Sequence, residues 1–170
     1  MARRIRISNL RKGFAVDRAA VRRVFAALDR DAPWTCPPGE LSIAFVDDAE
    51  IVRLHDDFLD DPTVTDVITF PGDDATTPGD SEAFAGEICV CVDQAVREAP
   101  KHGFTADDEL TLYLVHGWLH LAGHDDRTDA PRAAMREAEK VALALLRERK
   151  LMPAYGFPDA TKRKNVTGKR

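Results

Sequence analysis

Long apolar runs, a signal-like start and pairable cysteines are all missing from this sequence of 170 residues. No run of about 18 apolar residues occurs, so we expect no membrane-spanning segment. The opening stretch, MARRIRISNL, carries charge but no apolar core, so we expect no signal peptide. Only three cysteines occur, and Cys89 and Cys91 are poorly placed for a disulfide because they lie two apart on a predicted strand. We therefore interpret these two as small buried groups in a protein of the reducing cytoplasm.

Charge is unevenly distributed along the chain, although the formal net charge is only -5. Residues 31–110 hold twenty acidic and three basic side chains, whereas residues 1–30 and 111–170 are each net positive. The overall sign argues against a protein covered in nucleic-acid contacts. A local basic face built from the two ends of the chain is an open alternative to ordinary solvated surface charge.

The pattern of apolar residues predicts one α+β domain, in which about five helices cover a small mixed sheet of four strands. Alternating or β-branched stretches predict strands at residues 4–8, 41–46, 64–70 and 86–92. Capping residues predict helices that begin near residues 17, 47, 93, 105 and 129, the third ending at Pro100 and the fourth near Leu121. Phe58 and Val141 are among the apolar side chains expected to face the core.

Two segments are expected to lie outside this regular structure. Residues 71–83 read as a polar, acidic loop that is long for a compact domain, which favours mobility or function. Residues 153–170 are basic and punctuated by proline and glycine, which predicts a flexible C-terminal tail.

The stretch HGWLHLAGHDD, residues 116–126, concentrates three of the five histidines of the chain. His116 and His120 are four residues apart on a predicted helix, so both rings project from one face, one turn apart. Imidazoles in that arrangement can bind the same metal ion. The pair therefore predicts a metal site.

The third ligand must come from residues after the helix, since one helix cannot surround an ion. Gly123 permits the chain to turn back, and the spacing resembles the zincin pattern H-x-x-x-H-x-x-G-x-x-H, whose last position here is Asp126. His124 competes for this role, because it is the better zinc donor by type, but it lies only one residue beyond the glycine.

Gly117 stands where a metallopeptidase of the H-E-x-x-H kind has its general base. A glycine cannot transfer a proton, so the sequence argues against peptide hydrolysis. Two explanations of the glycine are open: it leaves room for substrate beside the ion, or it packs closely against the sheet.

Four stretches together resemble the YbeY-type endoribonucleases, the bacterial rRNA maturation factors. HGWLHLAGHDD is similar to the H-G-x-L-H-L-x-G-Y-D-H signature of that family. The stretches PTVTDVITFP (62–71), GEICVCVDQA (86–95) and ELTLYLVHG (109–117) resemble three further family segments. The resemblance runs in order from about residue 41 to residue 146.

The resemblance implies a metal-dependent hydrolase, usually with zinc, that cleaves single-stranded RNA. Its substrates would be rRNA precursors, notably the 3′ end of small-subunit rRNA, and its partners the ribosome and assembly factors. Residues 1–152 would then form the endoribonuclease domain, with His116 and His120 as metal ligands. The third histidine of the family falls on Asp126, which favours this residue over His124. A carboxylate is a harder ligand, so Mn²⁺ or Mg²⁺ is an alternative to Zn²⁺.

Another departure concerns phosphate binding, because Leu59 occupies the position where the family commonly has an arginine. Leucine cannot bind a phosphate, so the cation must be another residue, and Arg53, Lys101 and Arg127 are candidates. 

Two residues near the motif have open roles. His124, if it is no ligand, is a candidate general acid or base beside the ligands His116 and His120. Asp66 either orients a ligand histidine or is an ordinary carboxylate at the end of a strand.

Two other functions are compatible with the motif. One is a zincin-type metallopeptidase, and the other is a non-catalytic ribosome-assembly factor with a structural metal. A nuclease assay with a chelator control separates a nuclease from the metallopeptidase. A His116→Ala protein that unfolds on metal loss but still binds ribosomes would favour the assembly factor.

Overall fold

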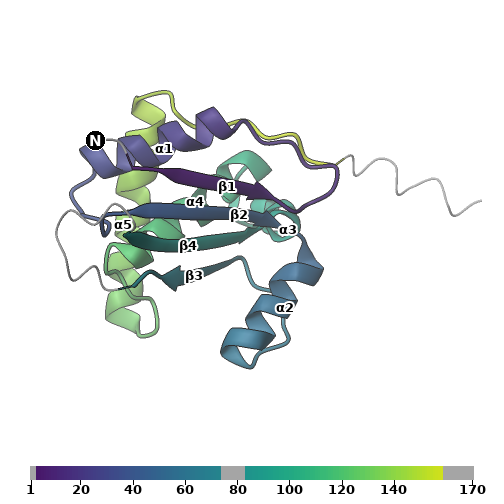
Figure 1. The fold of residues 1–170 in the computed structure, drawn as a ribbon. Helices are drawn as coiled ribbons and strands as arrows, with labels where there is room; N and C mark the ends of the chain where they lie inside the picture. Colours follow the sequence, from purple (N-terminus) through teal and green to yellow (C-terminus); the bar gives the residue numbers. More distant parts are fainter. Residues whose placement is uncertain (1–2, 74–82, 159–170) are drawn as a thin grey trace, which may run out of the picture.

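A mixed sheet organises the residues that the computed structural model describes, 3–73 and 83–158. Its four strands are β1 Ile5–Asn9, β2 Glu40–Val46, β3 Val67–Pro71 and β4 Phe84–Cys91. They lie in the order β1-β2-β4-β3, with β1, β2 and β4 parallel and β3 antiparallel to β4 (Figure 1). The predicted α+β class and mixed four-stranded sheet are confirmed.

Five helices accompany the sheet in the described ranges: α1 Arg18–Asp31, α2 Asp48–Leu59, α3 Val92–His102, α4 Ala106–Leu121 and α5 Asp129–Glu148. The larger hydrophobic core joins one face of the sheet to α1, α4 and α5 (Figure 1). A smaller core lies on the other face, where α2 places Ile51 against Val46 and Ile68. The sheet is thus covered more heavily on one face than on the other.

Helix α4 is the central helix of the larger core. The side chain of Thr105 caps it by accepting a hydrogen bond from the backbone N–H of Asp108, at 3.1 Å. Leu110, Leu114 and Trp118 are fully buried, so this helix has a fixed position against the sheet. Side chains near its C-terminal end are therefore held on a rigid element.

Two of the apolar residues expected in the core lie at the surface. Phe58 is 61% exposed because α2 extends beyond the edge of the sheet (Figure 1), and its ring meets that of Phe70 edge to face. Val141 is 49% exposed because Ala142, Leu143 and Leu146 make up the buried face of that part of α5. Both placements were wrong in the sequence analysis.

Element ends also differ from the prediction. α3 continues through Pro100 and ends at His102, where Gly103, with φ +70°, closes the helix. β3 begins at Val67 and not at residue 64. Most of the predicted 71–83 loop, residues 74–82, lies outside the described residues.

The first residues of the predicted tail pack onto the domain. Gly156 pairs with Ala15 through backbone hydrogen bonds of 2.8 and 2.9 Å. The backbone N–H of Tyr155 donates to Asp107 at 2.7 Å, and its ring stacks on Phe14. Residues 153–158 therefore belong to the folded body, and residues 159–170 lie outside the described part of the chain.

All three cysteines are buried free thiols. Cys89 and Cys91 lie under α2 in the smaller core, which agrees with the sequence interpretation. Burial raises the pKa of the Cys36 thiol to about 11, and that of Cys89 and of Cys91 to about 12. None of the three is a thiolate at neutral pH.

Candidate metal centre

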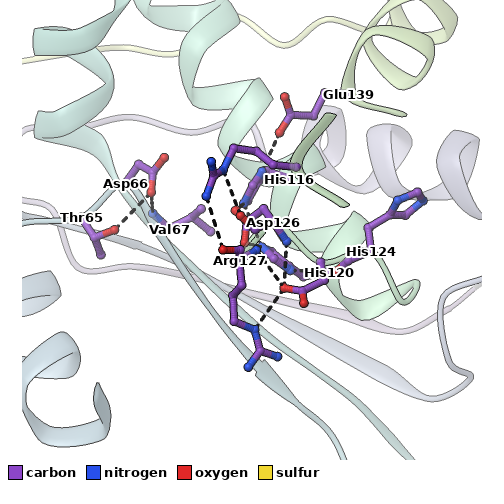
Figure 2. Close-up of polar contacts among 11 residues, drawn as sticks. Thr65, Asp66, Val67, His116, His120, His124, Asp126, Arg127 and Glu139 are labelled. Atoms are coloured by element: carbon purple, nitrogen blue, oxygen red, sulfur yellow. Dashed lines mark hydrogen bonds and ion pairs between the residues drawn. The ribbon is translucent and has the colours of Figure 1, made fainter. Parts of the chain in front are cut away.

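The two histidines of α4 face each other at the end of that helix. Their rings are 4.5 Å apart between centroids and meet edge to face. The Nε2 atoms of His116 and His120 are 2.9 Å apart, and both side chains are partly buried. The predicted spacing of one helical turn therefore aims one nitrogen of each ring at the same point (Figure 2).

The chain then reverses direction at Gly123 and brings a carboxylate back to this point. Gly123 has φ +99°, a conformation that side-chain-bearing residues rarely adopt. After the turn, Asp126 places Oδ2 3.3 Å from Nε2 of His116 and Oδ1 3.6 Å from Nε2 of His120. The three side chains could hold one metal ion.

The distances in this cluster suit a tetrahedral ion. Two ligands bound at about 2.1 Å from such an ion lie roughly 3.4 Å apart. The three observed separations, 2.9, 3.3 and 3.6 Å, lie on both sides of that value. The cluster therefore needs only small adjustments to bind an ion.

The hydrogen bonds at the Nδ1 atoms of both histidines also suit a metal site. Nδ1 of His120 lies 3.0 Å from the carbonyl oxygen of His124, which can only accept, so Nδ1 carries the proton. Nδ1 of His116 lies 2.6 Å from Oε1 of Glu139, which fixes its proton in the same way. The two Nε2 atoms then present lone pairs to each other and to Asp126, an arrangement that a bound metal ion, or a proton on one ring, would stabilise.

Glu139 was missed in the sequence analysis, which considered Asp66 as the orienting carboxylate. Burial lowers the pKa of His116, but the hydrogen bond and charge of Glu139, with the charges of Asp66 and Asp126, raise it above its usual value overall. The Asp66 carboxylate accepts hydrogen bonds from Thr65 Oγ1 and from the N–H of Val67, so it makes local contacts just before β3. Glu139 lies on the face of α5 that packs against α4, and this position is the one feature of the sequence that could have identified it.

The structure does not bring the His124 ring into the cluster. The ring packs edge to face against Trp34, at 5.1 Å between centroids, and points away from the other two histidines in Figure 2. Its backbone carbonyl is the part that serves the site, by holding His120. The geometry thus supports Asp126 over His124 as the third ligand, although the His124 side chain lines the neighbouring groove.

A groove of about 1030 Å³ runs from the cluster along β3 to the end of α2. Of the three cations considered for phosphate binding, only Arg127 lines it. Arg53 is paired with Glu50 and Asp57 on its own helix, and Lys101 is paired with Glu98.

Close packing accounts for Gly117. A Cβ at this position would lie 2.5 Å from Cγ2 of Ile88 and 3.2 Å from Oγ1 of Thr69. Real Cβ atoms do not approach a neighbour that closely, so a larger residue would require Ile88 or α4 itself to shift. Of the two explanations, the structure supports packing against the sheet.

The fold and the cluster define a single-domain α+β protein with a His-His-Asp group suited to a metal ion. The family model described as Endoribonuclease YbeY matches residues 7–147, so this chain belongs to the YbeY family. The resemblance stated from the motifs is confirmed.

Individual relatives agree with this assignment. The chain is 46% identical over 101 residues to Endoribonuclease YbeY of Protochlamydia amoebophila, a match that covers 59% of this chain and 65% of the relative. It is 37% identical over 123 residues to Endoribonuclease YbeY of Rhodopirellula baltica, covering 71% of this chain and 61% of the relative. The chain thus spans a little under two thirds of the length of these relatives.

The fold also resembles a solved structure. The solution structure of a Thermotoga maritima protein matches with a TM-score of 0.55 and 24% identity, covering 98% of this chain and 99% of the other. This likeness concerns the fold alone. Within the described ranges, no helix has both the length and the apolar character needed to cross a bilayer.

Proposed function

We propose that this chain is a metal-dependent endoribonuclease that cleaves single-stranded RNA. The observation that carries the proposal is the meeting of His116, His120 and Asp126 at one point, with both far nitrogens of the rings held by acceptors. The family assignment supports the same activity. Gly117 leaves no room for the glutamate base of a zincin peptidase, so peptide hydrolysis is disfavoured.

Zinc is the metal that we propose first, since two imidazoles and one carboxylate are a zinc ligand set with a position left for water or substrate. The Asp126 ligand keeps Mn²⁺ and Mg²⁺ as alternatives. When bound, such an ion supplies a water of lowered pKa and positive charge for the phosphate.

The residues of the chain have separate tasks in this mechanism. Glu139 and the carbonyl of His124 keep protons on the two Nδ1 atoms, so both Nε2 atoms stay free to bind metal. Arg127, whose guanidinium is exposed at the groove, is the proposed phosphate-binding cation. His124, on the groove wall, is the proposed proton donor or acceptor for the reacting oxygens.

The proposed substrates are rRNA precursors, in particular the 3′ end of small-subunit rRNA, and the proposed partners are the ribosome and its assembly factors. A cytoplasmic location follows from this role and agrees with three free thiols. These points rest on the family assignment.

The test combines metal analysis with RNA cleavage on wild-type, Asp126→Ala and His124→Ala proteins. We expect the wild type to cleave a labelled single-stranded RNA, to stop on chelation, and to recover when Zn²⁺ or Mn²⁺ is returned. Asp126→Ala should lose metal and cleavage, while His124→Ala should keep its metal. 

Loss of metal in His124→Ala alone would contradict the ligand set. If RNA stays intact with the metal-loaded wild type while ribosome binding persists, the metal is structural and the nuclease assignment is wrong.

A further inference from the structure

Exposed apolar side chains are concentrated in the segment of the chain that forms one end of the groove. In the described ranges six large hydrophobic residues are exposed, and three of them, Phe58, Leu59 and Val64, lie at the end of α2 and just after it. Phe58 is the one aromatic residue of the six. A concentrated apolar patch of this kind marks a binding surface more often than scattered single residues do.

Two phenylalanines form one wall of the groove. Phe58 meets Phe70 of β3 edge to face, with 4.7 Å between ring centroids and 65° between ring planes. Both rings line the same groove as His120 and Asp126. An exposed aromatic face and a site for a metal ion thus share one cavity.

The groove has little positive charge of its own. Arg127 is the one lysine or arginine among its described lining residues, and its Nε lies 3.1 Å from Asp125. Asp73, Asp125 and Asp126 also line the groove. A nucleic-acid backbone gains affinity chiefly from several cations, so apart from the proposed metal ion and Arg127 the described lining of this groove offers little charge to bind RNA by its phosphates.

We propose that Phe58 and Phe70 form a stacking platform for an unpaired nucleobase next to the cleaved phosphate; this rests on the proposed function. Aromatic rings bind bases of single strands by stacking, with little dependence on sequence. Leu59, which is exposed and also lines the groove, extends the platform and adds no charge. The chain would thus bind its substrate by the base more than by the backbone.

A nucleobase fits this wall better than a protein partner does. Both phenylalanines line the groove that also reaches His120 and Asp126, and a nucleotide places a flat apolar base a short distance from an anionic phosphate. A protein partner would need no such proximity to the cluster. 

The test measures binding of a single-stranded 2′-O-methyl oligonucleotide to the metal-loaded full chain, and gel electrophoresis after each titration confirms that the oligonucleotide is still intact. Fluorescence anisotropy is recorded for wild-type, Phe58→Ala, Phe58→Leu and Phe58→Trp proteins, with Leu10→Ala as the control. Leu10 is 56% exposed and is not a lining residue of the groove, so its loss removes similar apolar surface elsewhere. Thermal unfolding and metal content confirm that each variant is intact.

We expect Phe58→Ala to weaken binding about 10-fold, Phe58→Leu to weaken it nearly as much, and Phe58→Trp to retain it. Leu10→Ala should bind as the wild type does. An oligonucleotide with abasic sites should bind wild type and Phe58→Ala equally. The logarithm of Kd should rise with the logarithm of salt concentration with a slope of about one, since few cations contact phosphate.

Binding by Phe58→Ala within twofold of the wild type, or a salt slope of about three or more, would overturn the platform. If the wild type still cleaves RNA in that case, only the platform is wrong. If Phe58→Ala binds RNA normally but no longer sediments with ribosomes, the patch is a protein contact and the platform is again wrong. Failure of the wild type to bind or cleave any single strand would reject both proposals.

Discussion

In the described ranges, helix α4 takes part in two imidazole–carboxylate hydrogen bonds, and only one of them adjoins the candidate metal cluster. His116 on α4 pairs with Glu139 of α5 at 2.6 Å. His102 at the end of α3 pairs with Glu109 of α4 at 2.9 Å. The two contacts are alike in type and length.

The difference lies beyond the imidazole. The second nitrogen of His116 faces His120 and Asp126, the two other residues of the candidate metal cluster. The hydrogen bonds and ion pairs of the described residues include none to the second nitrogen of His102, whose side chain is 48% exposed. A carboxylate on one ring nitrogen of a histidine therefore points to a metal site here only because further candidate ligands lie near the other ring nitrogen. Otherwise it satisfies a buried carboxylate, here Glu109, which is 1% exposed.

The largest effect expected from this comparison is on metal affinity. Glu139→Gln removes the charge that holds the proton on Nδ1 of His116, so the Kd for Zn²⁺ should rise about 10- to 100-fold. Glu109→Gln is the matched control and should leave the Kd within twofold. Competition with a chromogenic chelator measures both. Equal loss in the two variants would show that general destabilisation, and not orientation of the ligand, is responsible.

A smaller effect is expected on stability. His102→Ala removes the 2.9 Å hydrogen bond to Oε1 of Glu109, a buried carboxylate whose Oε2 already has no hydrogen bond in the described structure. The free energy of unfolding should fall by about 1 kcal/mol, limited by water that enters at the exposed ring. Urea denaturation measures the change, and metal affinity should not move. A large loss of metal would make the two pairs equivalent and the comparison wrong.

The smallest effect concerns the pH dependence of the metal-free protein. The pKa of His116 is raised in the folded state, so charged His116 stabilises the fold fully below its ordinary pKa of about 6.5. This contribution disappears as the pH rises through the raised value. In the presence of a chelator, the stability advantage of wild type over Glu139→Gln should therefore be larger at pH 6 than at pH 8.5. An advantage that grows toward pH 8.5 would contradict the sign of the shift.

Local patterns in the sequence were enough for much of the fold and part of the site. The pair His116 and His120 follows from helical geometry, and the position of Asp126 follows from the turn at Gly123. The alternation of Ile5 and Ile7, or of Leu41 and Ile43, likewise predicted strands that the structure confirms.

What the sequence could not provide depends on contacts between distant residues. Glu139 lies 23 residues beyond His116 in a helix with other charged residues, and only the packing of α5 on α4 selects it. Phe58 lies on the same face of its helix as Ile51. Whether a residue on that face is buried, however, depends on where the sheet ends. Pro100 was expected to end α3, yet a proline in the last turn of a helix removes only one hydrogen bond, and Gly103 ends it instead.

The buried thiols have a practical consequence for work with the metal. Zinc binds thiolates tightly, so cysteines often capture the ion during removal and reloading. Here Cys36, Cys89 and Cys91 stay protonated and shielded in the folded protein at neutral pH. A titration of folded protein should thus report the histidine cluster alone, and a single cysteine added at the surface should accept a maleimide dye without interference from the native three.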